Sequence, residues 1–136
     1  MNDEVAVEAA NAEFYAAFES SDLARMRNVW MDDDTASCVH PGWRMLRGTS
    51  RIMRSWAVIF ANTPYIQFFL TDTDVSVFGD VAVVRCVEGI LTSLGDRDGD
   101  ASVAATNVFL RHEDGWRLWL HHGSPVVQPA EQDGLG

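Results

Sequence analysis

Residues 103–125 read Val103-Ala-Ala-Thr-Asn-Val-Phe-Leu-Arg-His112, Glu113-Asp-Gly115 and Trp116-Arg-Leu-Trp-Leu-His-His-Gly-Ser-Pro125. An Asp-Gly pair between two apolar runs is one of the strongest short signals for a β-hairpin. We expect Asp114 and Gly115 to form the turn. Counting back from that turn places Asn107 directly across from His122. One face then carries Asn107, Phe109, Leu118, Leu120 and His122, and the other carries Thr106, Val108, Leu110, Trp119 and His121.

Two polar side chains among large apolar ones are typical of the wall of a small-molecule pocket. Directly opposed side chains on one face lie about 5 Å apart at Cβ, so Asn107 and His122 would lie side by side. Two structural polar residues near the end of a sheet would give the same pattern. Both interpretations are open at this point.

A second hairpin is predicted at Gly79-Asp80, between strands at residues 65–78 and 81–94. Asp74 then lies across from Arg85 on the outer face. The inner face carries Thr71, Thr73, Val75 and Val77 with Ala82, Val84, Cys86, Glu88 and Ile90. A carboxylate on an inner face is costly unless it is hydrogen-bonded or protonated, so Glu88 is a candidate site residue. A β-bulge in so long a strand would instead turn the Glu88 side chain to the opposite face of the sheet.

Three helices are expected before these strands. Residues 3–20 repeat apolar side chains at the spacing of one buried helical face, and a short helix follows Asp22. A third helix begins after Gly48, with Thr49 or Ser50 as its cap, and ends before Pro64. A short strand at residues 35–40 ends at Pro41, which holds His40 in an extended conformation. The apolar positions of the three helices are Val7, Ala10, Phe14, Ala17 and Phe18; Leu23, Met26 and Trp30; and Ile52, Trp56, Ile59 and Phe60.

Composition predicts one globular domain at residues 1–125 and a loose tail at 126–136. Apolar residues make up 47% of the 136 residues and charged residues 22%. The formal charge of −10 disfavours nucleic acid and anionic membranes as partners, because both bind through Lys and Arg. With no signal-peptide pattern and only Cys38 and Cys86, we expect a cytoplasmic protein with two buried thiols.

No metal or organic cofactor is predicted. The run Asp32-Asp33-Asp34 reads as a solvated loop, because adjacent carboxylates do not converge on one ion. The loop at residues 95–100 begins like a calcium loop but has Ala101 and Asn107 where that motif needs glycine and glutamate.

The residues resemble a known family. The segments that carry the resemblance are Trp30-Met-Asp-Asp, Cys38-Val-His-Pro-Gly42, Leu46-Arg-Gly48, Ala105-Thr-Asn-Val-Phe109, Gly115-Trp-Arg-Leu118 and His121-His122-Gly-Ser-Pro125. With the order of helices first and sheet after, the chain resembles the SnoaL-like branch of the nuclear transport factor 2-like superfamily over residues 3–125. The resemblance implies an α+β cone in which three helices pack in a strongly curved, mainly antiparallel sheet around one apolar pocket. That fold hosts enzymes and non-catalytic assembly domains.

The superfamily's ketosteroid isomerase suggests positions for a site. Its base precedes a proline after the second helix, which implies His40 here. Its oxyanion hole uses a first-helix tyrosine and a protonated aspartic acid on a late strand, and these positions fall on Phe14 and Asn107. Since Phe14 has no donor, the resemblance implies a looser acid–base role rather than a faithful ketosteroid isomerase.

Two hypotheses follow. In the first, a cofactor-free isomerase, cyclase or dehydratase acts on a hydrophobic carbonyl compound, with His40 as general base, Asn107 as oxyanion donor and His122 or Glu88 as partner. Its pocket would be lined by Phe14, Trp30, Trp43, Trp56 and Phe109. In the second, the same fold is a ligand-binding or assembly domain. The resemblance implies a homodimer in either case, for which Trp119 and Val108 could supply an apolar surface.

Overall fold

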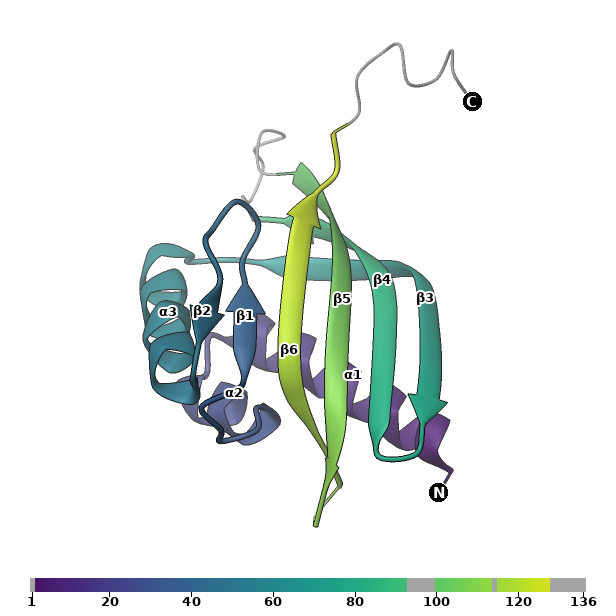
Figure 1. Ribbon diagram of the computed structural model, residues 1–136. Helices are drawn as coiled ribbons and strands as arrows, with labels where there is room; N and C mark the ends of the chain where they lie inside the picture. Colours follow the sequence, from purple (N-terminus) through teal and green to yellow (C-terminus); the bar gives the residue numbers. More distant parts are fainter. Residues whose placement is uncertain (1, 93–99, 114, 128–136) are drawn as a thin grey trace.

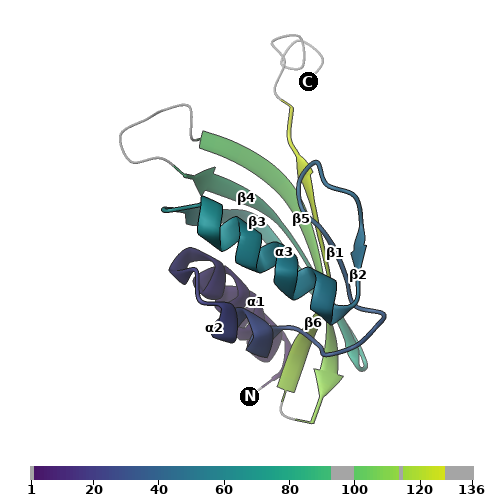
Figure 2. The same cartoon turned by 90° about the vertical axis from the view of Figure 1, so that its left-hand side faces the viewer.

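The computed structural model describes residues 2–92, 100–113 and 115–127. Three helices lie on the concave side of one curved, unclosed six-stranded sheet (Figures 1 and 2). The helices are α1 (Asp3–Ser20), α2 (Leu23–Val29) and α3 (Thr49–Asn62). The strands are β1 (Ser37–Val39), β2 (Leu46–Arg47), β3 (Gln67–Phe78), β4 (Val81–Leu91), β5 (Asp100–His112) and β6 (Gly115–Pro125). The expected α+β class and curved sheet are confirmed.

The helix boundaries follow from their capping residues. The side chain of Asn2 accepts a hydrogen bond from the Val5 amide at the start of α1, and that of Asp22 accepts one from the Arg25 amide at the start of α2. The cap of α3 differs from expectation. Gly48 is its N-cap residue, and the Thr49 hydroxyl instead donates to the Met31 carbonyl.

The sheet has the order β2-β1-β6-β5-β4-β3 (Figure 1). Every pairing is antiparallel except that of β1 with β6, which is parallel and sets Val39 beside His122. This pairing brings the end of β1, and with it His40, next to β6. Among the described residues no helix is long and apolar enough to cross a membrane.

The β3–β4 hairpin confirms the predicted turn, with Phe78 paired to Val81 and Asp74 to Arg85. Beyond Asp74 a bulge shifts the register on β3, and Asp72 in this segment adopts a positive φ of 54°. Because of the bulge, Thr71 and Thr73 are exposed rather than on the inner face as expected. The bulge lies on β3 and leaves β4 regular, so Glu88 points inward, as predicted, and is 3% exposed.

The β5–β6 hairpin forms, but its predicted register is wrong. Gly115 already pairs with His112 as part of β6, and Asp114 lies outside the described residues. The pairing then slips at one point, from Phe109 with Leu118 to Val108 with Leu120, which leaves Trp119 as an extra residue. This β-bulge reverses the alternation of side chains beyond it.

The bulge exchanges the two adjacent histidines. Asn107 pairs with His121, which is 2% exposed, while His122 pairs with Thr106 on the outer face. Leu120 likewise leaves the inner face, on which the sequence had placed it together with His122. The remaining members of the predicted face, Asn107, Phe109 and Leu118, are fully buried as expected.

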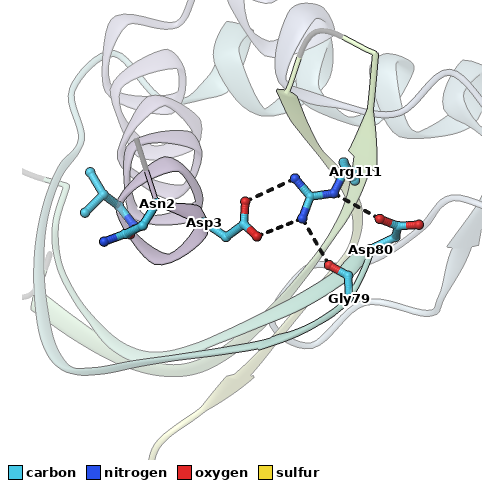
Figure 3. Close-up of polar contacts among 6 residues, drawn as sticks. Asn2, Asp3, Gly79, Asp80 and Arg111 are labelled. Atoms are coloured by element: carbon cyan, nitrogen blue, oxygen red, sulfur yellow. Dashed lines mark hydrogen bonds and ion pairs between the residues drawn. The ribbon is translucent and has the colours of Figure 1, made fainter.

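An exposed arginine ties the start of α1 to the sheet (Figure 3). The guanidinium of Arg111 on β5 donates to both carboxylate oxygens of Asp3, to the carboxylate of Asp80 and to the Gly79 carbonyl in the β3–β4 turn. It also lies 4.4 Å above the ring of Trp116. Three segments far apart in sequence therefore meet at one cation.

Candidate functional site

A connected group of polar side chains lies between α1 and the sheet, in the middle of the apolar core. Its central member is Asn107, which is 0% exposed. The amide nitrogen of Asn107 lies 2.9 Å from Asn11 Oδ1 and 3.2 Å from the Tyr15 hydroxyl, and its oxygen lies 2.6 Å from His121 Nδ1. The Tyr15 hydroxyl lies in turn 2.5 Å from Glu88 Oε2. We call these five residues the interior network.

The direction of each hydrogen bond in the interior network follows from donor count. Both amide hydrogens of Asn107 are donated, one to Asn11 and one to the oxygen of Tyr15. The Tyr15 hydroxyl therefore donates to Glu88. Since Asn107 Oδ1 accepts, His121 carries its proton on Nδ1 and keeps a lone pair on Nε2. Asn107 has no amide hydrogen left for an oxyanion, so in this arrangement it positions its neighbours.

Glu88 is the only acidic residue among the described residues that are buried. Burial raises the pKa of its carboxyl to about 7, against the hydrogen bond from Tyr15, which lowers it. At neutral pH both its protonated and ionised forms are populated. Burial, with the nearby Glu88 carboxylate adding to it, raises the pKa of Tyr15 above its usual range, so this hydroxyl stays protonated as a donor.

His40 occupies a second buried position, at the end of β1. Its Nε2 lies 2.9 Å from the Ser55 hydroxyl on α3, which donates to the Ile52 carbonyl at 2.6 Å. The Ser55 proton is thus committed, so His40 donates from Nε2, and the lone pair on its Nδ1 faces the Cys38 sulfur at 3.8 Å. Burial lowers the pKa of His40 to about 4. Burial also lowers the pKa of His121, to about 3, with smaller contributions from the nearby His40 and His122. Both imidazoles are neutral at pH 7.

Aromatic rings connect the two histidines. The ring of Trp56 lies 4.7 Å from that of His40 and 6.5 Å from that of His121, measured between centroids. Phe14 lies 4.9 Å from His121 and 5.7 Å from Trp56. The histidines and the interior network therefore belong to one buried region between the helices and the sheet.

A family model described as SnoaL-like domain matches residues 7–128 of the chain. This chain is a member of the SnoaL-like domain family. A solved protein from Streptomyces avermitilis, named as a candidate dehydratase of the NTF2-like family, is 48% identical, with a TM-score of 0.84 over 90% of this chain and 94% of that one. The resemblance to the nuclear transport factor 2-like superfamily is thereby confirmed.

Two further relatives carry different names. A Thiobacillus denitrificans structure, named as a candidate calcium/calmodulin-dependent protein kinase type II association domain, is 33% identical, with a TM-score of 0.80 over 88% of this chain and 94% of that one. F-box protein SKIP8 of Arabidopsis thaliana is 24% identical over 127 residues. That match covers 93% of this chain and 52% of SKIP8, so the SnoaL-like domain spans about half of that curated relative.

The structure brings together most of the residues predicted for the site. His40, Glu88 and Asn107 are buried with Phe14, Trp30, Trp56 and Phe109. Trp43 differs, since 44% of it is exposed, although its ring meets His40 edge-on at 4.8 Å. His122 is not part of the buried region. It lines a hollow of about 430 Å³ on the outer face of the sheet, with Asp72, Arg85, Thr106 and Ser124 among its neighbours.

Three members of the interior network escaped sequence reasoning: Asn11, Tyr15 and His121. Asn11 and Tyr15 follow Val7 at successive four-residue steps, so they share its buried face. A search for polar residues at the spacing of the apolar stripe could have found them. The inward direction of His121 depends on the bulge and has no such signal.

The described residues contain no group of three or more His, Cys, Asp and Glu side chains placed to hold a metal ion. Cys38 and Cys86 are both buried and free, in agreement with expectation. Burial raises the pKa of both thiols, so neither is a reactive thiolate at neutral pH.

Proposed function

We propose that this SnoaL-like domain binds a hydrophobic small molecule and acts on it as a cofactor-free acid–base enzyme of the isomerase, cyclase or dehydratase type. The observation that carries the proposal is the environment of Glu88. Its carboxyl is buried, is held by Tyr15 at 2.5 Å and has a pKa near 7. Perturbed carboxyls of this kind are suited to giving and taking a proton at neutral pH.

The buried region contains a carboxyl whose pKa is raised and two imidazoles whose pKa values are lowered. His40 and His121 are neutral, and each can accept a proton on one ring nitrogen, which in His40 is Nδ1, facing the Cys38 sulfur at 3.8 Å. Glu88 retains its own proton in part and can donate it. Environments that push the pKa values of neighbouring groups apart assign the acid and base of a reaction. Here a histidine would take the proton from the carbon beside a carbonyl, and Glu88 would protonate the departing hydroxyl.

A dehydratase-type reaction fits this division. As the histidine removes the α-proton, the carbon–carbon double bond forms and the carbon–oxygen bond breaks, and the proton of Glu88 releases the hydroxyl as water. The Streptomyces avermitilis protein at 48% identity is named as a candidate dehydratase, which supports the same class. Isomerisation and cyclisation use the same first step.

The experiment is a test for α-proton abstraction that needs no knowledge of the natural substrate. A panel of cyclic ketones and β-hydroxyketones is incubated with the protein in D2O, and deuterium incorporation beside the carbonyl is followed by NMR. We expect protein-dependent exchange that Glu88→Gln and His40→Gln each reduce at least about tenfold. His112→Gln, at the exposed end of β5, is the matched control. Exchange no faster than in buffer across the panel would reject the enzyme.

An assembly role is the second candidate, favoured by exposed apolar residues on the sheet. Phe69 is 55% and Phe78 69% exposed, on β3. The Thiobacillus denitrificans relative named as a candidate association domain is 33% identical.

Of the two residues considered for a dimer surface, Trp119 donates its indole N–H to Thr35 within the same chain. A homodimer through the outer face predicts that Phe69→Glu lowers the mass measured by sedimentation to that of one chain, and an unchanged mass rejects that interface.

A further inference from the structure

The charges of the chain are unevenly distributed along the sequence. Residues 35–71 contain four arginines and no acidic residue, whereas the rest of the chain carries all twenty acidic residues and the other six arginines. A chain with a formal charge of −10 therefore includes one basic segment, and that segment contains the whole of α3. Charge asymmetry of this kind determines which molecules a surface attracts.

Three arginines on the helices, Arg27 on α2 and Arg51 and Arg54 on α3, are exposed and have no acidic partner. In the part of the chain that the structure describes, none of the three forms an ion pair. Ion pairs are formed elsewhere, by Arg25, Arg85 and Arg111. The three unpaired guanidiniums can therefore bind an acidic group from outside the chain.

Two of these arginines line a groove between α2 and α3, which lie next to each other on the helical side of the fold (Figure 2). We call it the α2–α3 groove. It has a volume of about 270 Å³ and is lined by Leu23 and Arg27 from α2 and by Ser50, Met53, Arg54 and Ala57 from α3. Met53 is 3% exposed, while Arg27 and Arg54 are exposed. The groove thus combines an apolar floor with two cations at its rim.

The arginines of α3 are placed where they are unfavourable for the helix itself. Arg51 lies in the first turn and Arg54 in the second, although the helix dipole favours negative charge at this end. Residues three apart are neighbours on a helix, so the two like charges repel each other. By contrast, α1 has Asp3 and Glu4 in its first turn. Charges that destabilise their own helix and have no described ion-pair partner indicate a role toward another molecule.

The size of the basic surface limits the kind of anionic partner. The exposed residues Arg51, Arg54 and Val58 follow one another at three and four positions, so they form a stripe about 10 Å long on α3. A single phosphate or carboxylate ion contacts only part of this stripe and leaves the apolar floor of the groove unused. A segment of a protein chain can cover both.

Larger polyanions are disfavoured by the acidic residues next to α3. The backbone amide of Asp33 donates to Thr49 Oγ1 at 2.8 Å, so the run at residues 32–34 borders the first residue of the helix. Nucleic acid and anionic membranes extend beyond the groove and meet these carboxylates within the Debye length of about 8–10 Å. A short acidic segment avoids them.

We propose that the α2–α3 groove docks a short acidic segment of a partner protein. Its carboxylates bind the guanidiniums of Arg27 and Arg54, whose planar donors match a carboxylate, and one apolar side chain lies against Leu23 and Met53. The inference goes beyond the proposed function and does not depend on it, because neither arginine belongs to the buried region.

Binding of the intact protein to an array of synthetic peptides tests the proposal. In the array, glutamates surround one leucine at every spacing, and each peptide has a copy with glutamine in place of every glutamate. The affinity of the best peptide is then measured by fluorescence anisotropy. We expect saturable binding that weakens with added salt, and a loss of about tenfold in Arg27→Gln and in Arg54→Gln.

Arg44→Gln is the matched control. Arg44 is an exposed arginine of the same basic segment, lies in the connection between β1 and β2 and does not line the groove. Its replacement changes the net charge equally, so the affinity should change by less than about twofold. Because Arg27 and Arg54 are exposed, we expect all three variants to unfold at the same urea concentration as the unmodified protein.

Several results would overturn the inference. It fails if no peptide of the array binds at low salt, or if the glutamine copies bind as tightly as the acidic peptides. It also fails if Arg44→Gln weakens binding as much as Arg54→Gln, because net charge and not the groove would then explain the affinity. The assignment of a protein partner fails if inorganic phosphate, an RNA oligonucleotide or phosphatidylserine vesicles bind more tightly than the best peptide and lose affinity in Arg54→Gln.

Discussion

Tyr15 and Glu88 lie 73 residues apart in the chain, yet their hydroxyl and carboxylate oxygens are 2.5 Å apart between α1 and β4. The carboxyl of Glu88 has few other sources of stabilisation, because it is 3% exposed in an apolar interior. Tyr15 is itself fixed by the amide of Asn107, so the hydrogen bonds of the interior network join the helix to the sheet. The stability of the fold and the acidity of Glu88 are therefore linked.

Replacing Tyr15 by Phe removes that connection and keeps the ring. We expect the free energy of unfolding to fall by about 1–3 kcal/mol, because Glu88 and the Asn107 amide each lose a buried partner. The pKa of Glu88 should rise further, since the lost hydrogen bond lowers it. Tyr65→Phe is the matched control, as its hydroxyl donates to Gln67 at a partly exposed position. Equal losses in urea denaturation of the two variants would contradict the assignment.

Glu88 predicts a specific dependence of stability on pH. Its folded-state pKa of about 7 is above the ordinary value of 4.5, so its contribution to stability is complete below about pH 4.5 and is lost as the pH rises through 7. At about 1.4 kcal/mol per pKa unit, Glu88→Gln should gain about 3 kcal/mol relative to the unmodified protein between pH 4.5 and 8. Glu8→Gln, on the exposed face of α1, controls for the substitution itself.

The histidines act in the opposite direction. The pKa values of His40 and His121, about 4 and 3, lie below the ordinary 6.5, so their contribution is present above pH 6.5 and is lost as the pH falls through these values. Between about pH 4.5 and 6.5 they oppose Glu88. Removal of Glu88 should therefore make acid unfolding steeper. If the free energy of unfolding changes with pH in the same way in Glu88→Gln and in the unmodified protein, Glu88 is not buried as described.

The bulge at Trp119 predicts unequal effects at two adjacent histidines. His121→Ala leaves Asn107 Oδ1 without its donor and opens space beside Phe14, which should cost about 2–4 kcal/mol. His122→Ala changes an exposed side chain and should stay within about 0.5 kcal/mol. Chemical denaturation of both variants is the measurement. A larger loss in the free energy of unfolding for His122→Ala than for His121→Ala would contradict the bulge and support the register without it.

The contacts of Arg111 predict a local effect at the N-terminal end of α1 (Figure 3). Arg111→Ala removes the bonds to Asp3 and Asp80 together, so amide exchange in the first turn of α1 and in the β3–β4 turn should accelerate. Added salt should reduce the difference from the unmodified protein. Arg25→Ala breaks a single exposed ion pair with Glu13 and is the control. If the two variants exchange alike at α1, Arg111 does not tie these segments together.

Local sequence signals were enough to predict the order of the elements apart from the two-residue strand β2, which was not predicted. Residues 3–20 carry a helical stripe, and α1 has these bounds. Gly79-Asp80 predicted both the turn and the pairing of Asp74 with Arg85, because a two-residue turn sets the register of the strands next to it. Such signals act over a few residues and need no knowledge of the rest of the fold.

The bulges lay beyond local signals. Trp119 leaves the ladder of β6 and donates to Thr35, a residue 84 positions away, so its place depends on a contact between distant segments. This one extra residue places His121, rather than the predicted His122, in the buried region. The parallel pairing of β1 with β6, which brings His40 beside the site, is also a product of the tertiary fold.

The candidate site was predicted in part. Glu88, Asn107 and His40 were recognised as polar residues in apolar patterns, and all three are buried. Asn11 and Tyr15 were missed because polar side chains on an amphipathic helix are ordinarily exposed. The role expected for Asn107 changed once its hydrogen bonds were known, since both its amide hydrogens have partners.

The most direct test of an acid–base site in this domain is a ¹³C NMR titration of the Glu88 carboxyl, with and without 2-tetralone. The account predicts a pKa near 7 in the free protein, assigned through loss of the signal in Glu88→Gln, and a clear change of that pKa when the ketone binds. A Glu88 carboxyl that titrates near 4.5 and does not respond to the ketone would contradict it.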